Sequence, residues 1–445
     1  MASIEQRVIP AILAMIRARR EAPSAPVGDL QVHSSGEVAP VRLREALFSD
    51  FSAVAELKQR WGWGADSLEN WERLWRRNPA LIESECERPI GWVLEADGAV
   101  VGYLGNISLL YRYGDKTLTA VAGHGLVVDP PYRVVGVSLV ASFFRQKSVD
   151  LYITTSAIEA TGRLALAFKS SFLPQPDYDT VLFWVLQAYP FAQVLMKKLK
   201  LGPALSQIGS FLASLAVGTD KILQRRWPRR SSASLSVREI SVSEIGDDFQ
   251  ALWQEKLNEK PRLFADRSPA ALRWHFEIPG DRGSVRALCC YKNRELVGYA
   301  IVRNDTNPEN GLRSSMIADM VARQDDSEVV RALWVAAYDH AKHVGSHILE
   351  VLGFPPNIRS VCSRWNPYLR KYPACPFLYK AADPALHQTL SEEMAWYASP
   401  FDGDMTLIRP SYSSPALPAT AGMRIQDNGN GVISDVPGRA RTEVI

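Results

Sequence analysis

The chain has 445 residues, which is enough for two or three domains. Hydrophobic residues make up 47% of it and charged residues 22%, the ordinary balance of a soluble globular protein. The formal net charge of +3 at pH 7 is too small to indicate nucleic acid as a partner, so we expect no nucleic-acid binding.

The five cysteines indicate neither a disulfide framework nor a zinc site, because their number is odd and none are spaced as Cys-x-x-Cys. We therefore expect a reducing compartment, a cytoplasmic location and no metal. No apolar run reaches the roughly 18–20 residues that span a bilayer. Residues 1–40 are interpreted as a short amphipathic helix, "MASIEQRVIPAILAMIRARR", and a flexible linker rich in Pro, Ser and Gly.

Two blocks of ordinary composition follow, at 41–188 and 237–410, separated by a connector at 189–236. The tail at 411–445 is expected to be disordered. The blocks share "AVVGYLGNI" and "ELVGYAIVR", and each of these segments follows a short polar turn, "ADGA" or "KNRE", that predicts a β-hairpin. The sequence therefore predicts a duplicated α/β domain.

In the first block, "HGLVVDPPYRVVGVSLVASFFRQ" predicts a strand that runs into a helix. Pro130 and Pro131 end the strand because proline has no N–H to donate, and the helix is predicted to begin near Gly136. The first N–H groups of a helix lack partners and carry a partial positive charge, so such a loop favours an anion. With the fixed charge of Arg133 and the hydroxyl of Ser138, we expect it to bind a diphosphate.

The pattern V-x-P-x-[YF]-R-x-x-G-x-[GAS] in this stretch resembles the acetyl-CoA-binding segment of the GNAT superfamily of N-acyltransferases. The matching positions are Val128, Pro130, Tyr132, Arg133, Gly136 and Ser138. "VRLREALFSDFSAVAELKQRW" and "AVVGYLGNISLLY" also resemble early elements of that fold, so the resemblance covers residues 41–188. It implies the fold class α/β (α+β), with two GNAT-like domains, each a mixed, mostly antiparallel sheet flanked by helices and joined by a helical connector.

The resemblance further implies acetyl-CoA or another acyl-CoA as co-substrate, a small-molecule amine as acceptor, and no metal. In this superfamily strands four and five diverge, the pantetheine arm pairs with the exposed edge of strand four, and the following loop holds the pyrophosphate. The residues that would take these roles are Leu126, Val127, Val128, Arg133, Val134, Val135, Gly136, Val137 and Ser138.

Three side chains are candidates for the general base. His124 lies on the predicted strand four near the expected thioester, and imidazole readily accepts a proton near neutral pH; the alternative is a histidine bonded within the sheet. Glu159 is placed at the mouth of the cleft or on the solvated surface, and Asp129 is expected to cap a turn. We select His124 and Glu159 as catalytic. The tyrosine that often protonates the thiolate in the superfamily is missing, because Ala167 and Phe168 occupy the matching region.

Tryptophans crowd the segment "RWGWGADSLENWERLWRR". Trp71 and Trp75 are four residues apart on a predicted helix, so we expect them to pack in the core. Trp61 and Trp63 fall where the resemblance implies the acceptor site. We expect these two to bind the acceptor, because flat aromatic faces suit a sugar or another bulky group.

The connector predicts two amphipathic helices broken at Gly202-Pro203. One interpretation is a helical connector that packs on a domain. The other is peripheral membrane contact through 189–232, because basic residues flank an apolar face. These residues are Lys197, Lys198, Lys200, Arg225, Arg226, Arg229 and Arg230.

The second block has Gln324-Asp325-Asp326-Ser327 where the first has its phosphate loop. Carboxylates there satisfy the helix dipole and repel a diphosphate, so we expect no second coenzyme site. His340, His343 and His347 share a helical face, but no acid or cysteine completes a metal site, and we expect a packed or solvated face. Asp402-Gly403-Asp404 is interpreted as turn chemistry.

The sequence leaves more than one function open. The first is acyl transfer to the primary amine of an amino sugar or other small metabolite. The second is a non-catalytic scaffold or binding protein of the same fold, in polysaccharide assembly at a membrane surface. A third keeps the fold but uses aminoacyl-tRNA, as peptidoglycan-bridge transferases do, and the weak basic charge and lack of a long helical arm argue against it. The acceptor, the acyl length and the oligomeric state are not predicted.

Overall fold

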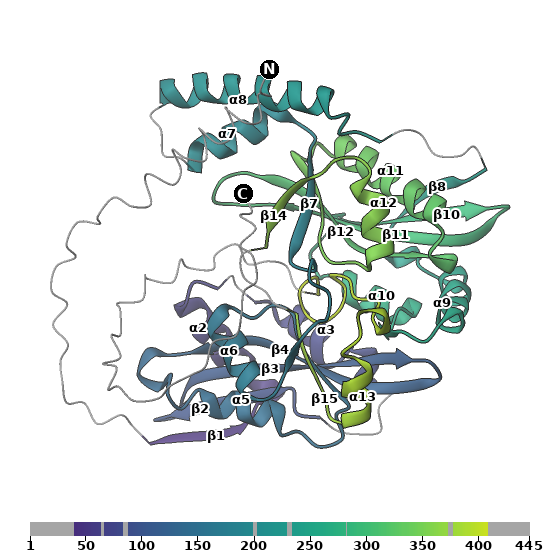
Figure 1. Cartoon of the computed structure of the whole chain (residues 1–445). Helices are drawn as coiled ribbons and strands as arrows, with labels where there is room; N and C mark the ends of the chain where they lie inside the picture. Colours follow the sequence, from purple (N-terminus) through teal and green to yellow (C-terminus); the bar gives the residue numbers. More distant parts are fainter. Residues whose placement is uncertain are drawn as a thin grey trace, which may run out of the picture.

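The computed structural model describes residues 40–63, 66–82, 88–198, 203–228, 234–281, 283–372 and 377–407. Within these ranges the chain forms two sheets, drawn one above the other in Figure 1. The amphipathic helix expected within 1–40 and the tail expected at 411–445 lie outside the described residues, apart from residue 40 itself.

The first sheet has the strand order β1-β2-β3-β4-β5-β15-β6. Its strands from the first block are β1 (Val41–Glu45), β2 (Gly91–Ala96), β3 (Ala99–Tyr113), β4 (Lys116–Val128), β5 (Leu151–Thr154) and β6 (Ser171–Phe172). Only β4 and β5 pair in parallel, so the sheet is mixed and mostly antiparallel, as predicted.

Helices cover both faces of this sheet because its strands alternate apolar side chains between two cores. The helices are α2 (Phe51–Arg60), α3 (Leu68–Trp75), α4 (Pro79–Ile82), α5 (Val137–Phe144) and α6 (Glu159–Ala167). On β2, Val93 packs in the core that contains Leu57 and Trp71, whereas its neighbour Leu94 packs in the core that contains Val140 and Phe143. Thus α2 and α3 lie on one face of the sheet, and α5 lies on the other.

The second sheet repeats this plan with the order β8-β10-β11-β12-β13-β7-β14. Its strands are β8 (Ser236–Ile240), β10 (Val285–Lys292), β11 (Glu295–Thr306), β12 (Arg313–Ala322), β13 (Ile348–Val351) and β14 (Tyr368–Lys371). Its helices are α9 (Asp247–Glu259), α10 (Pro269–Phe276), α11 (Ser327–His343) and α12 (Pro356–Ser363), whereas α13 (Pro384–Thr389) packs on β15 of the first sheet. Again only one pair, β12 with β13, is parallel.

Both predicted hairpins form at the expected turns. Asp97 and Gly98 have φ of 48° and 75°, and Asn293 and Arg294 have φ of 51° and 71°. Two central residues in the left-handed region match the right-handed twist of paired strands, which is why both two-residue turns close a hairpin.

Each sheet takes strands from the other half of the chain, and the first sheet also includes the short β9 (Leu263–Ala265), which pairs with β3. β7 (Thr180–Val185) follows the first block but lies between β13 and β14, and β15 (Leu378–Ala381) lies between β5 and β6. Trp184 of β7 is fully buried and its ring centre is 4.8 Å from that of Trp334 in the second half. The two sheets therefore do not follow the expected division into 41–188 and 237–410, because an apolar strand pattern does not specify which sheet the strand joins.

Between the halves, α7 (Ala188–Lys198) and α8 (Pro203–Leu223) pack against one another at the outer end of the upper half (Figure 1). Two helices broken at Gly202-Pro203 are what the connector predicts. Within the described part of the chain, no helix has the length and apolar character needed to cross a membrane.

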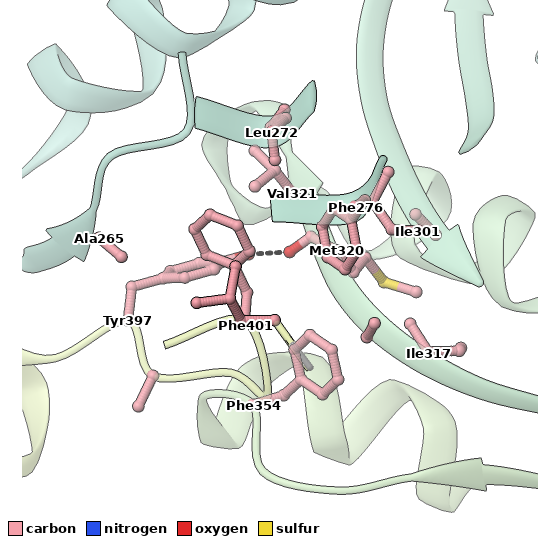
Figure 2. Packing of buried hydrophobic residues seen from close by; sticks show 14 of the residues in the cluster. Ala265, Leu272, Phe276, Ile301, Ile317, Met320, Val321, Phe354, Tyr397 and Phe401 are labelled. Atoms are coloured by element: carbon pink, nitrogen blue, oxygen red, sulfur yellow. Dashed lines mark hydrogen bonds between the residues drawn. The ribbon is translucent and has the colours of Figure 1, made fainter. Parts of the chain in front are cut away.

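The described chain after α13 packs between the two halves. Tyr397 and Phe401 lie among buried side chains that include Phe276, Met320 and Phe354, as Figure 2 shows. The ring centres of Tyr397 and Phe264 are 4.8 Å apart. This C-terminal segment, residues 396–407, joins the two sheets into one continuous core and carries the chain back toward β4 and β5.

Candidate functional site

The two parallel strands of the first sheet diverge soon after they meet. β4 and β5 pair only over Ala120–Ala122 and Leu151–Ile153, while β4 continues to Val128 and pairs with β3 on its other side. In the described chain, no strand occupies the β5 side of residues 123–128. A bulge at Gly125, whose φ is +65°, turns this part of β4. The result is an unpaired row of backbone groups, the β4 edge.

A cavity of about 110 Å³ lies beside the β4 edge. It is lined mainly by β4, α5, α6 and the end of β5, and its walls are mostly apolar. Leu126 and Phe143 form part of those walls, and His124 and Ser156 are among the few polar side chains that reach it. Trp63 also lines the cavity, where we expected the acceptor. A mostly apolar cleft with a few convergent polar groups is the usual form of a small-molecule site.

The predicted anion loop at 133–138 lies between a short 3-10 helix, Pro130–Tyr132, and the start of α5 at Val137. The backbone N–H groups of this loop fall into two sets, one with hydrogen-bond acceptors and one without. The N–H groups of Arg133, Gly136 and Ser138 donate to backbone carbonyls within 130–135, whereas no described backbone group accepts from those of Val134, Val135 and Val137. Three amides thus remain free at the helix N-terminus, where an anion is favoured.

Ser138 and Gly136 of this loop have roles other than those that the sequence predicts. The Ser138 hydroxyl donates to the Val135 carbonyl at 2.7 Å rather than facing outward. A Cβ at Gly136 would lie 3.0 Å from both the Arg133 carbonyl oxygen and the Val128 side chain, so this glycine lets the loop pack on β4. Arg133 is exposed and its guanidinium carbon is 5.6 Å from the Trp61 ring centre.

Trp61 supports the loop and does not line the cavity. Its indole N–H donates to Asp129 at 2.7 Å, and Arg60 pairs with the other oxygen of the same carboxylate at 2.9 Å. Asp129 therefore fastens the end of α2 to the end of β4, and its side chain makes no helix-capping bond. Since both its oxygens are occupied by donors, Asp129 is a poor candidate for the general base.

His124 is 7% exposed and lines the cavity. Its Nδ1 lies 3.4 Å from Oδ2 of Asp404, in the C-terminal segment. That carboxylate also accepts from the hydroxyls of Ser156 at 2.6 Å and Thr155 at 3.0 Å. No described residue bonds to Nε2 of His124, which leaves that nitrogen available as an acceptor. Such a histidine–carboxylate pair orients an imidazole and stabilises its protonated form.

Gly403 allows Asp404 to reach this position. A Cβ at Gly403 would lie 2.4 Å from the Thr155 hydroxyl oxygen, and its φ is +80°. Any side chain there would push the C-terminal segment away from β5. The turn chemistry inferred for Asp402-Gly403-Asp404 is therefore incomplete, because this stretch also delivers a carboxylate to the first half.

A second ionic pair, Lys58 with Asp66, lies near His124. Lys58 of α2 is buried, and its Nζ is 2.8 Å from Asp66. Burial would raise the pKa of Asp66, but attraction to Lys58 and His124 outweighs it and holds that pKa below its ordinary value. Asp66 thus stays ionised and adds negative potential near His124.

Glu159 lies at the start of α6, is 80% exposed, and pairs with Arg163 on the helix surface. It does not line the cavity. Phe168, at the site of the missing tyrosine, stacks on Phe144 with ring centres 5.3 Å apart and has no proton to give. The β4 strand places Leu126 at the cavity, Val127 in one core and Val128 against the other.

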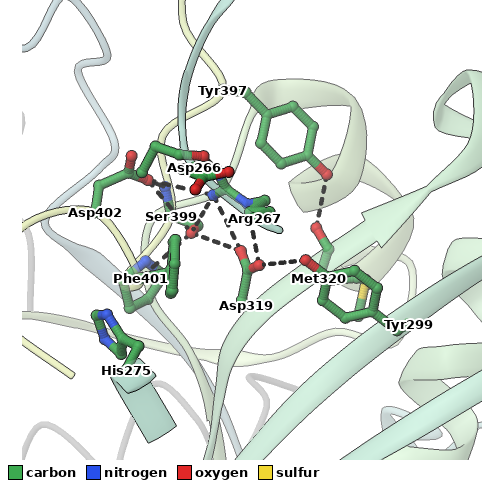
Figure 3. Close-up of polar contacts among 12 residues, drawn as sticks. Asp266, Arg267, His275, Tyr299, Asp319, Met320, Tyr397, Ser399, Phe401 and Asp402 are labelled. Carbon is green, nitrogen blue, oxygen red and sulfur yellow. Dashed lines mark hydrogen bonds and ion pairs between the residues drawn. The ribbon is translucent and has the colours of Figure 1, made fainter. Parts of the chain in front are cut away.

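The corresponding cleft of the second half is filled. β12 and β13 pair only over Ser314–Ile317 and then diverge, but the C-terminal segment occupies the gap. The Tyr397 hydroxyl donates to the Met320 carbonyl at 2.6 Å, as Figure 3 shows. Asp319 is fully buried and bonds Arg267 at 3.0 Å and Ser399 at 2.8 Å.

The loop after β12 is occupied by charge pairs. Asp325 is 2.6 Å from Lys256 and 3.0 Å from Arg262, and Asp326 caps α11 by accepting from the Glu328 N–H. Carboxylates therefore stand where the first half has free amides and an exposed arginine. The expectation of no second coenzyme site stays a prediction.

The three histidines of α11 and its end are held separately. His340 contacts Glu239 at 3.0 Å, and Nδ1 of His347 accepts the Arg313 N–H at 3.3 Å, while His343 is exposed. Across the described ranges, no cluster of three or more His, Cys, Asp or Glu is placed to hold a metal ion.

Sequence reasoning missed Lys58, Asp66 and Asp404. Asp404 is 280 residues from His124, so no local spacing signals their contact. Lys58 lies just before the tryptophan segment and Asp66 lies within it, and only the fold shows that their charges meet.

No protein-family model matches the sequence, and no curated protein matches it. Solved structures do. A GCN5-related N-acetyltransferase from Anabaena variabilis has a TM-score of 0.50 and 11% identity, with 77% of this chain and 73% of that chain covered. A GCN5-related N-acetyltransferase from Kribbella flavida has a TM-score of 0.46 and 12% identity, with 78% of this chain and 72% of that chain covered. Eis1 from Mycobacterium abscessus has a TM-score of 0.45 and 12% identity, with 79% of this chain and 76% of that chain covered.

The likeness to the Anabaena variabilis structure extends over both sheets of this chain's described part, since 77% of the chain is covered. At this level of identity it concerns the fold alone. The chain has the GCN5-related N-acetyltransferase fold, present twice and interleaved through exchanged strands.

Proposed function

We propose that this protein is an N-acyltransferase that moves an acetyl or other acyl group from acyl-CoA to a primary amine. The observation that carries the proposal is the unpaired β4 edge, which runs past His124 and ends at a loop with three free amides. The residues present suit the thioester, the pantetheine arm and the pyrophosphate of the coenzyme.

Binding follows from the backbone. The pantetheine arm contains amide groups, and these would pair with residues 123–128 as an added strand would. The free N–H groups of Val134, Val135 and Val137 would donate hydrogen bonds to the pyrophosphate oxygens, and the exposed Arg133 would neutralise part of the pyrophosphate charge.

His124 is the base that we assign to the reaction. Its Nε2 would take a proton from the acceptor amine as the amine nitrogen forms a bond to the thioester carbon and the carbon–sulfur bond breaks. Asp404 would stabilise the resulting imidazolium from the other side of the ring. The sulfur leaves as a thiolate, which water can protonate, so the absent tyrosine does not prevent the reaction.

The acceptor that we favour is a small amine with a flat or cyclic body, such as an amino sugar. Trp63 is the one of the two candidate tryptophans that lines the cavity, and an aromatic face there would stack on such a ring. Trp61 serves the phosphate loop instead and is no longer assigned to the acceptor.

Calorimetric titration with acetyl-CoA, followed by a thiol-release assay over a panel of amines that includes amino sugars, tests this proposal. We expect Arg133→Glu to weaken acetyl-CoA binding by at least about tenfold, because a repulsive charge replaces an attractive one. Arg163→Glu, at another exposed arginine, is the matched control and should bind normally. His124→Asn should retain binding and lower kcat by roughly 10²–10⁴. No binding at millimolar coenzyme would refute the proposal.

A non-catalytic binding protein of the same fold is the second candidate, and one observation favours it. Ala167 and Phe168, where the superfamily often has a tyrosine, carry no hydroxyl that could protonate the expected sulfur. If acetyl-CoA binds but no amine releases thiol, and His124→Asn changes nothing, this second function replaces the first. A role in polysaccharide assembly would then be examined by co-purification.

A further inference from the structure

The helix α8 exposes a broad apolar face. Seven large apolar side chains on it are each between 52% and 69% exposed: Leu205, Ile208, Phe211, Leu212, Leu215, Ile222 and Leu223. At 3.6 residues per turn they cover an arc of about 120°, wider than the narrow seam through which two helices of a coiled coil meet. Isolated exposed apolar residues are normal on a protein surface, but a continuous face of this kind marks a contact surface.

The opposite side of α8 is held by the protein. A Cβ at Gly209 would lie 2.8 Å from the Met196 sulfur, so α8 packs closely on α7 there. At the far end, Lys221 donates to the Leu186 carbonyl at 3.5 Å and Arg226 pairs with Asp220 at 2.8 Å. The helix is therefore fixed in orientation, and its apolar face points away from the rest of the chain.

Charge is distributed around this face in a way that identifies what covers it. Residues 203–219 contain no charged side chain, which is unusual for the outer face of a surface helix. Residues 188–228 contain six basic residues and one acidic residue, Asp220, whose charge Arg226 neutralises. Exposed cations stand at both ends of the apolar face, Lys197 at the end of α7 and Arg225 just beyond α8.

Aromatic side chains complete the pattern. Tyr189 and Trp227 are 43% and 39% exposed, near the start of α7 and beyond the end of α8. Tyrosine and tryptophan, with an apolar ring and a polar tip, concentrate at the boundary between lipid and water. Since α8 cannot cross a bilayer, an apolar face bordered by cations and such rings suits a helix lying in the plane of an anionic membrane surface.

We propose that the α7–α8 hairpin docks the protein on an anionic lipid membrane, with the apolar face of α8 inserted among the headgroups and acyl chains. A second copy of the chain is the less suitable occupant, because a two-fold contact would bring two strongly basic hairpins together. The inference does not depend on the acyltransferase proposal, since none of the residues used for it line the β4 cavity.

Vesicle flotation of the full chain tests this docking, with phosphatidylcholine vesicles that either contain or lack phosphatidylglycerol. We expect the protein to float with the anionic vesicles, and the double variant Leu212→Glu, Leu215→Glu to lower the partition coefficient by at least about tenfold. Lys197→Gln with Arg225→Gln should lower it by roughly tenfold on anionic vesicles. Leu369→Glu, at a 54% exposed leucine of β14, is the matched control and should bind like the wild type.

Thermal melting followed by circular dichroism, together with acetyl-CoA titration of each variant, separates loss of docking from loss of folding. Failure of the wild type to float with anionic vesicles would overturn the inference, as would equal losses for the α8 and Leu369 variants. A dimer that the α8 double variant converts to monomer, without any vesicle binding, would also overturn it and assign the face to a second copy.

Discussion

The two divergent strand pairs of this protein have the same backbone plan and opposite contents. In the first half, β4 leaves β5 and its edge stays unpaired beside a cavity. In the second half, β12 leaves β13 and the gap holds a buried ionic network and the aromatic rings of the C-terminal segment. A duplicated fold can thus keep one copy as a binding cleft and turn the other into a structural joint.

The C-terminal segment that fills the second cleft also contributes to the cleft of the first half. The segment that fills the second gap through Tyr397 and Ser399 continues to Gly403 and Asp404, which contact Thr155 and His124 in the first half. The filled cleft therefore positions a carboxylate in the open one. The segment that fills the second cleft is thus the same one that reaches His124 in the first half.

The largest effect should come from breaking the ionic network of the filled cleft. Asp319→Asn leaves the buried Arg267 with only Asp402, at 3.5 Å, as a carboxylate partner. Burial alone would lower the pKa of Arg267, but its two carboxylates hold it above the ordinary value, so the arginine stays charged. We expect a loss of about 3–5 kcal/mol in the free energy of unfolding, measured by urea titration.

Asp179→Asn is the control for that measurement, because its partner Lys371 is half exposed and such a pair contributes less than about 1 kcal/mol. Titration of the Asp319→Asn variant should still give one acetyl-CoA per chain. Equal destabilisation by the two variants, or a second coenzyme bound, would contradict the description of the second cleft as a closed joint.

The link between the clefts is tested at Asp404. We expect Asp404→Asn to lower kcat by roughly 10- to 100-fold while acetyl-CoA affinity stays within about twofold, because the carboxylate stabilises the protonated imidazole and touches no part of the expected coenzyme path. Asp404→Glu should recover part of the rate.

Activity reduced only in proportion to folded protein, with no recovery in Asp404→Glu, would mean that Asp404 is structural. The assignment of His124 as the base would then lose its main support from the second half, while the coenzyme site would be unaffected.

The smallest effect concerns the loops that end the two central strands. Burial opposes ionisation of Asp325, but Lys256 and Arg262 outweigh it and lower its pKa from 3.8 to about 2. The carboxylate therefore contributes stability that is fully present above pH 4 and is lost as the pH falls through the folded value. A change of one in pKa corresponds to about 1.4 kcal/mol. We therefore expect Asp325→Asn to lower the free energy of unfolding by roughly 2 kcal/mol near pH 6 and by less near pH 3.

Urea unfolding of wild type and variant at both pH values gives the comparison. A difference that does not shrink toward pH 3 would show that Asp325 acts by packing rather than by charge, and that the acidic loop is not the electrostatic counterpart of the Arg133 loop.

Short-range signals in the sequence predicted the turns, the strand-to-helix loop and the break between the connector helices. The hairpin turns at Asp97-Gly98 and Asn293-Arg294, the strand-to-helix loop after Val128 and the break at Gly202-Pro203 all have local signals in turn residues and apolar spacing. The same signals could not assign Trp61, whose place depends on a hydrogen bond to Asp129, 68 residues away.

By itself, the sequence determined the fold class, the duplication and the strand-to-helix loop after Val128, because turns, prolines and apolar periodicity act over a few residues. Only the tertiary structure decided that β7 and β15 change sheets, that the second cleft is filled, and that Asp404 meets His124. Those outcomes depend on contacts between residues up to 280 positions apart, and local pattern holds no information on which buried partner satisfies a given strand edge or charge.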